Sequence, residues 1–142
     1  MWEALLDRAL SEREVIEVVT SLLPVAGSEV QVVSDLAAGE VRPGIRVLCE
    51  RRTQKGEFLC RLSLYLRDQR LRAFHEREFF QGLARRFQCR CLVSDGAPSP
   101  HSMLLLRGPS RTSQAWLDAD RLEQEEYVLV RSGRTASDKG GR

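Results

Sequence analysis

The sequence predicts an α+β domain built on a mostly antiparallel sheet, with two amphipathic helices packed on one face of that sheet. Residues 11–23 and 70–88 place their apolar side chains at helical spacing. Short stretches rich in β-branched or alternating apolar residues lie between these helices and after the second one. An order of helix, three strands, helix and further short strands is typical of this fold class.

The first helix has a clear beginning and end. Ser11 and Glu14 form an S-x-x-E capping box, and Pro24 stops the helix. The helix is amphipathic because its apolar residues form one stripe: Val15, Ile16, Val19, Leu22 and Leu23. Four apolar residues before it predict a short helical turn, either separate or continuous with the helix: Trp2, Leu5, Leu6 and Ala9.

Three strands are expected next. Residues 29–36 contain enough β-branched side chains to favour a short strand, and residues 37–44 have the composition of a loop. Residues 45–66 predict a long hairpin that turns at Gln54 and Lys55, which would pair Cys49 with Cys60. One face of this hairpin is apolar and the other is charged, so the cysteine face is expected to point to the core.

The second helix is expected to cover the cysteine face of the sheet. Its apolar stripe consists of Phe79, Phe80, Leu83, Ala84 and Phe87, with Leu71 and Phe74 near its start. The residues after it predict a strand at 89–95, a Gly/Pro loop at 96–101, a hairpin around residues 108–111 and a last strand at 126–131.

Domain organisation follows from length and composition. A chain of 142 residues is close to the commonest size of one domain. Residues 1–131 are therefore interpreted as one globular α+β domain. Residues 132–142 are polar and glycine-rich, which predicts a disordered tail.

The four cysteines raise the question of a zinc site. Period-two alternation places Cys89 and Cys91 on one face of their strand, so all four thiols are expected in one apolar layer. Structural zinc sites usually take C-x(2 to 4)-C pairs, whereas this chain has C-x(10)-C and C-x-C. Alternate strand residues also lie about 6 to 7 Å apart at Cα, which is awkward for two ligands of one metal. We expect buried free thiols and no metal, with zinc or a cross-strand disulfide as the alternatives.

Composition excludes several classes of function. The formal net charge of +2 gives no argument for a polyanionic partner. No apolar run approaches the roughly 18 residues that cross a bilayer, and the N-terminal stretch lacks the pattern of a signal peptide. We therefore expect no membrane association and a cytoplasmic location.

No catalytic motif stands out in the sequence. The two histidines, His75 and His101, have no glycine-framed nucleophile turn beside them. Neither G-x-G-x-x-G nor a P-loop occurs, so nucleotide binding has no motif. The sequence predicts a protein that is not an enzyme and has no cofactor.

The stretch LDADRLEQEEY, residues 117–127, is strongly acidic, since Arg121 is its one basic residue. A carboxylate cluster can bind a metal or a basic partner, although a solvated turn is the simpler interpretation. The helix region before it is rich in arginine, and such separation of charge suits a protein surface better than nucleic acid. A nucleic-acid-binding module is a less favoured alternative, because no aromatic platform accompanies the arginines.

Residues 79–130 resemble small bacterial proteins of the toxin-immunity type. In that class a helix leads into a strand ending in Asp, followed by a proline loop, a hairpin and an acidic segment that closes with a Tyr-led strand, and this chain carries FQCRCLVSD, GAPSPH and LDADRLEQEEY in that order. The resemblance implies a non-catalytic cytosolic protein that binds and neutralises a cognate toxin. Many inhibitors of nuclease toxins are acidic and this chain is not, which argues against a nuclease as the target.

The predicted partner is therefore a cognate protein toxin or effector. The partner-binding residues expected from the acidic stretch are Asp118, Asp120, Glu123 and Glu126. The element order is also similar to that of small secretion chaperones, which bind an effector, and this class remains the alternative.

Overall fold

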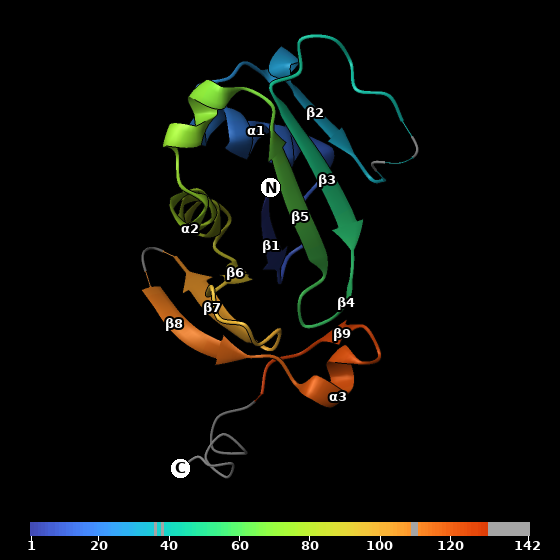
Figure 1. Cartoon of the computed structure of the whole chain (residues 1–142), viewed down its shortest axis with the longest axis vertical. Coiled ribbons are helices and arrows are strands. Elements are labelled where there is room, and N and C mark those ends of the chain that lie inside the picture. Colours follow the sequence, from blue (N-terminus) through green and yellow to red (C-terminus); the bar gives the residue numbers. More distant parts are fainter. Residues whose placement is uncertain (36, 38, 109–110, 131–142) are drawn as a thin grey trace.

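The computed structural model describes residues 1–35, 37, 39–108 and 111–130, and the predicted tail at 132–142 lies outside the described residues. Its main sheet has seven strands in the order β2-β3-β5-β1-β6-β7-β8. All neighbouring pairs in it are antiparallel except β2 and β3, which are parallel. Figure 1 shows that the sheet curves, with α2 on its inner side. The predicted α+β class is confirmed.

The strands and helices follow one another in a mixed order. The strands of the main sheet are β1 (Trp2–Leu6), β2 (Val30–Val33), β3 (Val47–Thr53), β5 (Cys60–Leu66), β6 (Arg90–Ser94), β7 (Ser102–Arg107) and β8 (Arg111–Trp116). The helices are α1 (Glu12–Leu22), α2 (Glu76–Phe87) and the short α3 (Ala119–Leu122), with 3-10 turns η1 (Gly27–Glu29) and η3 (Gln69–Ala73). A second, two-stranded sheet pairs β4 (Lys55–Gly56) with β9 (Glu126–Tyr127) in parallel.

The first helix confirms its predicted cap. The Ser11 hydroxyl accepts a hydrogen bond of 3.1 Å from the Glu14 N–H, and the Glu14 carboxylate accepts one of 2.9 Å from the Ser11 N–H. This reciprocal pair satisfies N–H groups that the first turn of any helix leaves open. The helix ends at Leu22, before Pro24, as expected.

The predicted helical turn at the N-terminus is wrong, because Trp2–Leu6 is a central strand of the sheet. All five residues of β1 pair with β5, from Trp2 opposite Leu64 to Leu6 opposite Cys60. Trp2, Ala4 and Leu6 share one face with Glu3 and Leu5 on the other, but a run of five residues is too short for this alternation to be distinguished from a helical turn. Pairing with strands far along the chain decides its conformation.

The predicted hairpin register is also wrong. Thr53 pairs with Cys60 and Cys49 with Leu64, so the connection spans residues 54–59 instead of a two-residue turn. The longer connection forms because Lys55 and Gly56 pair with β9. The partner of Cys49 moves from residue 60 to residue 64, an even step, so Cys49, Cys60 and Leu64 keep the predicted inward direction. Phe58, predicted on the same face, lies instead in the connection and packs in the apolar cluster on the other face.

Two further elements differ from their predictions. The expected continuous helix at 70–88 is divided into η3 and α2, with Phe74 and His75 in extended backbone between them. The expected last strand at 126–131 is shorter within the described residues: β9 covers Glu126–Tyr127, followed by an isolated bridge between Leu117 and Leu129.

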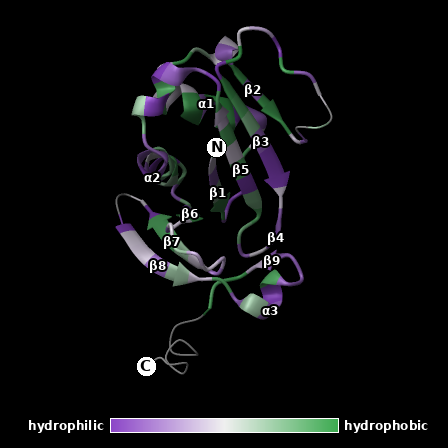
Figure 2. Ribbon diagram, viewed as in Figure 1, coloured by the Kyte–Doolittle hydropathy of each residue, from purple (hydrophilic) through white to green (hydrophobic). Residues whose placement is uncertain are grey.

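The main core lies between the sheet and the helices α1 and α2, as predicted. All four cysteines are free and buried in it, alongside Phe79, Phe80, Leu83 and Ala84 of α2. In Figure 2 the hydrophilic residues of α2 are on the side away from the sheet. A smaller apolar cluster lies on the opposite face, around Leu5, Phe58, Leu92 and Leu105, and Leu117 and Leu129 close it from the C-terminal segment.

Candidate functional site

The sheet opens between β1 and β6, and this opening is the centre of the candidate site. The two strands pair only at Leu5 with Leu92 and at Leu6 with Cys91. Beyond that point the N–H of Glu3 donates a hydrogen bond of 2.8 Å to Oε2 of Glu76, at the first turn of α2. A side-chain carboxylate thus takes the place of a neighbouring strand.

A cleft of about 410 Å³ occupies this position. Its apolar wall includes Leu5, Leu92 and Met103 from the main sheet. The C-terminal segment supplies the facing wall through Leu117, Leu122 and Tyr127. Glu3, Arg61 and Glu76 place charge at the same cleft, so it combines apolar surface with a few polar groups, as protein binding pockets commonly do.

Arg61 connects the two walls of the cleft. Its Nη2 donates a hydrogen bond of 2.6 Å to the hydroxyl of Tyr127, and its guanidinium lies 5.6 Å from the centre of that ring. Its Nε lies 3.2 Å from a carboxylate oxygen of Glu3. The Nε–H is not directed at that oxygen and has no hydrogen-bond acceptor among the described residues. The Glu3 contact is therefore an ion pair without a hydrogen bond, and the buried Nε–H is an unsatisfied donor within the described residues.

The acidic stretch forms α3 and β9 next to this cleft. Asp118 is the N-cap of α3, and its carboxylate accepts hydrogen bonds from the backbone N–H groups of Asp120, at 3.0 Å, and Arg121, at 3.1 Å. Glu126 accepts a hydrogen bond of 2.6 Å from Nε of Arg121. This bond and the nearby charges of Glu126 and Asp118 raise the pKa of Arg121. Two of the four predicted partner-binding residues are thus also used to shape the segment.

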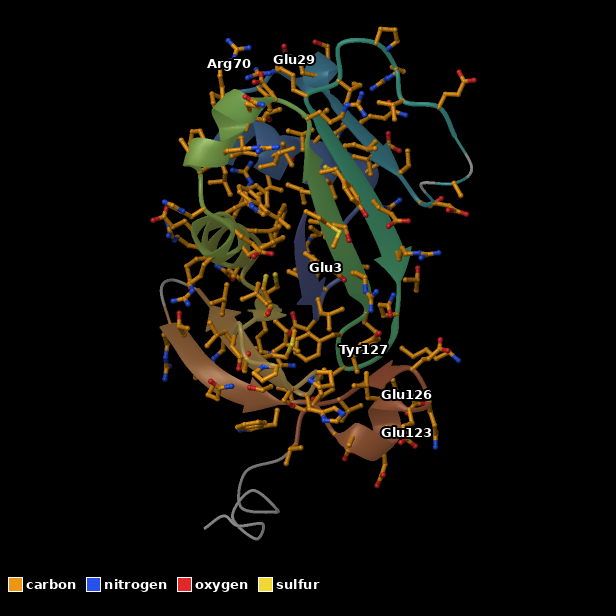
Figure 3. The ribbon with its side chains drawn as sticks, in the orientation of Figure 1. Glu3, Glu29, Arg70, Glu123, Glu126 and Tyr127 are labelled. Atoms are coloured by element: carbon orange, nitrogen blue, oxygen red, sulfur yellow. The ribbon has the colours of Figure 1, made fainter. Side chains whose placement is uncertain are left out.

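The other two predicted residues, Asp120 and Glu123, are exposed to solvent. Glu125 beside them is also exposed and has a positive φ of 61°. Figure 3 shows Glu3 in the middle of the molecule, with Tyr127, Glu126 and Glu123 progressively nearer the α3 end. The structure therefore gathers the predicted residues in one short segment, of which Asp120 and Glu123 are open to a partner.

The segment is fastened to the rest of the chain through the connection between β3 and β5. The N–H of Glu57 donates to the carbonyl of Tyr127 at 2.8 Å, and the N–H of Leu129 donates to Oε1 of Glu57 at 2.8 Å. Gly56 has a φ of 98°, and a Cβ added there would lie 2.6 Å from the Tyr127 nitrogen. Glycine at this position lets the two backbones approach closely enough to pair.

The two histidines, the candidate general bases, are not part of the cleft lining. His75 is the exposed N-cap of α2, and His101 precedes β7, where its carbonyl accepts from the N–H of Leu117. Within the described ranges, no three His, Cys, Asp or Glu side chains are grouped so that they could hold a metal ion. In that same part of the chain, no helix has the length and apolar character needed to span a bilayer.

Sequence reasoning missed Glu3, Arg61, Glu76 and Tyr127 as members of one site. Their meeting depends on β1 being a strand, and the sequence signal for it is the alternation of Trp2, Ala4 and Leu6 with Glu3 and Leu5. No protein-family model, curated protein or solved structure matches this chain.

Proposed function

We propose that this protein acts by binding, as a cytosolic immunity protein that captures and neutralises a cognate protein toxin. The observation that supports this best is the position of the acidic segment. Asp118 and Glu126 hold α3 and β9 in a fixed shape, while Asp120 and Glu123 remain exposed beside a partly apolar cleft. A charged rim next to an apolar recess is a typical arrangement of a protein-binding surface.

The charge of the segment indicates the chemistry of the partner. Residues 118–126 contain Asp118, Asp120, Glu123, Glu125 and Glu126 against Arg121. Such a surface attracts a basic loop, since opposite charges accelerate encounter and disfavour partners of the wrong sign. A toxin with lysine or arginine around its active site fits this surface.

The cleft gives the partner a place for an apolar anchor. Leu5, Leu92 and Leu122 line it, and Tyr127 adds an aromatic ring at its edge. Most binding energy at protein interfaces comes from a few side chains buried in such pockets, with a polar rim around them. In this proposal Asp120 and Glu123 orient the partner, and the cleft supplies the affinity.

The test is co-expression with the product of the adjacent large gene. An immunity protein restores growth to cells that make the toxin and copurifies with it. A secretion chaperone would instead keep its effector soluble, without any toxicity to relieve. If the neighbour is harmless alone and does not copurify, the immunity proposal fails.

Variants separate the function from the assignment of its surface. The double variant Asp120→Lys/Glu123→Lys should lose protection, whereas Glu12→Lys/Glu17→Lys on α1 makes the same change in net charge and should retain it. Both pairs are exposed in the free protein. If the wild type and both double variants protect equally, the acidic segment is not the binding surface, and the toxin must bind elsewhere on the protein.

A further inference from the structure

Three arginines form a row across neighbouring strands of the main sheet. Arg90 of β6 pairs with Arg107 of β7, and Arg107 pairs with Arg111 of β8. Residues directly opposite each other on antiparallel strands point to the same face, with their Cβ atoms about 4.5 to 5.5 Å apart. Like charges in such positions repel one another and lower the stability of the sheet. A negatively charged surface that approached this arginine row would offset the repulsion.

The arginine row is only partly neutralised by the rest of the chain. The Asp7 carboxylate lies 2.7 Å from Nε of Arg90. Arg107 and Arg111 are exposed, and neither forms an ion pair with another of the described residues. The row therefore keeps an excess of positive charge that is open to solvent.

The arginine row and the acidic segment, residues 118–126, lie on the same face of the sheet. Leu92, two residues along β6 from Arg90, belongs to the apolar cluster that the C-terminal segment closes. Alternate residues of a strand share a face, so Arg90 points to the side of that cluster. Its guanidinium lies 5.2 Å from the centre of the Phe58 ring, which is part of the same cluster.

The strand β8 separates these two charged surfaces. It begins at Arg111 in the arginine row, and Figure 1 shows that it runs toward α3 in the acidic segment. A strand rises about 3.3 Å per residue, so the two surfaces are about 20 Å apart. They are too distant to neutralise each other within one molecule.

A second copy of this chain fits this face better than a nucleic acid does. A nucleic acid that lay along the face from the arginine row would meet the carboxylates of residues 118–126 and be repelled by them. A second copy turned about a two-fold axis places its acidic segment on the arginine row and its arginine row on the acidic segment. Both contacts then form at once, in a closed dimer.

We propose that the protein associates with itself as a weak two-fold dimer, in which the arginine row of each copy contacts the acidic segment of the other. Arg107 and Arg111 of one copy face Asp120 and Glu123 of the other, and all four side chains are exposed in the single chain. The dimer does not depend on toxin binding. Where the proposed function also holds, the dimer and the toxin complex exclude each other, because both use Asp120 and Glu123.

Sedimentation equilibrium of the full chain tests the dimer without any toxin. At low ionic strength we expect the average mass to rise with concentration, from 16.1 kDa toward that of a dimer. In about 1 M salt, where the Debye length falls to about 3 Å, the mass should return to that of the monomer. A mass that stays at 16.1 kDa up to about 1 mM protein would overturn the proposal. Association that strengthens with salt would also overturn it.

Charge reversal tests whether these two surfaces meet. Arg107→Glu/Arg111→Glu and Asp120→Lys/Glu123→Lys should each stay monomeric alone, because each variant brings like charges together. An equimolar mixture of the two variants should dimerise, because the reversed row of one then meets the reversed segment of the other. Dimerisation of either variant alone would overturn the assignment. So would a mixture that stays monomeric under conditions in which the wild type dimerises.

A second mixture controls for attraction between oppositely charged proteins in general. Glu12→Lys/Glu17→Lys changes the net charge as much as the reversal of the acidic segment does, but it alters exposed residues of α1. Mixed with fluorescently labelled Arg107→Glu/Arg111→Glu, it should leave the labelled protein monomeric, because one of the two contacts is then repulsive. A labelled protein that dimerises equally in both mixtures would show that net charge alone drives the association.

Discussion

The carboxylate of Glu76 accepts a hydrogen bond of 2.8 Å from the backbone N–H of Glu3, at the place where β1 and β6 separate. A strand N–H that faces no neighbouring strand needs another acceptor when it is removed from water. Glu76 supplies it from the first turn of α2. The cleft beside β1 therefore exists without leaving this amide unpaired.

Replacing Glu76 with alanine tests this arrangement. We expect Glu76→Ala to lower the free energy of unfolding by about 1 to 2 kcal/mol, because a partly buried N–H loses a charged acceptor. Glu78→Ala is the matched control, since Glu78 lies in the same first turn and is exposed. Urea unfolding measures both, and equal losses in the two variants would show that helix charge, not the Glu3 contact, is responsible.

Gly56 should be indispensable for holding the acidic segment in place. In Gly56→Ala the new Cβ would collide with the backbone of Tyr127, so β4 and β9 separate. The amides of Glu57 and Leu129 should then lose protection from hydrogen exchange, while those of β5 keep theirs. Gly39→Ala is the control, because a Cβ at Gly39 meets nothing within 4 Å. Retained protection at Leu129 in Gly56→Ala would contradict this account.

The corrected hairpin gives Phe58 and Leu59 opposite environments. Phe58 is 0% exposed, in the apolar cluster on the α3 side of the sheet, and Leu59 is 43% exposed. Phe58→Ala should therefore cost about 3 to 5 kcal/mol of stability, by loss of apolar contacts and creation of a cavity. Leu59→Ala should cost no more than about 0.5 kcal/mol. Denaturant titration distinguishes them, and comparable losses would argue for another connection between β3 and β5.

The protein should lose stability at low pH because the Asp95 carboxylate becomes protonated. Its carboxylate accepts hydrogen bonds from the Ser102 hydroxyl, the Gln114 amide and the Ala97 N–H, and these lower its pKa from 3.8 to about 2. A lowered folded-state pKa stabilises the fold above the ordinary value of 3.8, and that contribution is lost as pH falls toward 2.

The measurement is the melting temperature between pH 6 and pH 2 for the wild type and Asp95→Asn. The variant should melt lower at pH 6 and should lose less on acidification, because it has no carboxylate to protonate at this position. Parallel curves for the two proteins would exclude Asp95 as a source of the acid dependence. The Asp68 carboxylate, whose pKa Arg70 and Arg46 also lower, should account for part of the remaining slope.

The sequence predicted those parts of the fold that local chemistry decides. Ser11 and Glu14 satisfy each other's backbone within four residues, so their motif is visible without tertiary information. The inward direction of the cysteines follows from the alternation of side chains along a strand. The predicted register was wrong by four residues, and a shift by an even number leaves each side chain on the same face. The strand conformation of Trp2–Leu6 and the pairing of Gly56 with Tyr127 could not be predicted from local sequence. Each depends on partners that are distant in the chain.

The candidate site was likewise predictable only where local sequence decides its structure. The acidic composition of residues 118–126 was evident, and Asp118 at the start of a helical turn is a recognisable cap. The use of Glu126 to hold Arg121 could not be predicted, because the turn around Glu125 brings them together. The cleft itself arises from β1, β6 and α3, which are far apart in the sequence.

The most direct test of the proposed function is calorimetric titration of the purified product of the adjacent large gene, the proposed toxin, into the wild type and the two charge-reversed proteins. We expect Asp120→Lys/Glu123→Lys to raise the Kd by about tenfold or more, equivalent to about 1.4 kcal/mol of binding free energy. The affinity of this variant should also depend less on salt concentration than that of the wild type. Glu12→Lys/Glu17→Lys should bind as the wild type does. Binding of unchanged affinity by Asp120→Lys/Glu123→Lys would contradict the assignment of the acidic segment, and absence of binding by the wild type would contradict the immunity function.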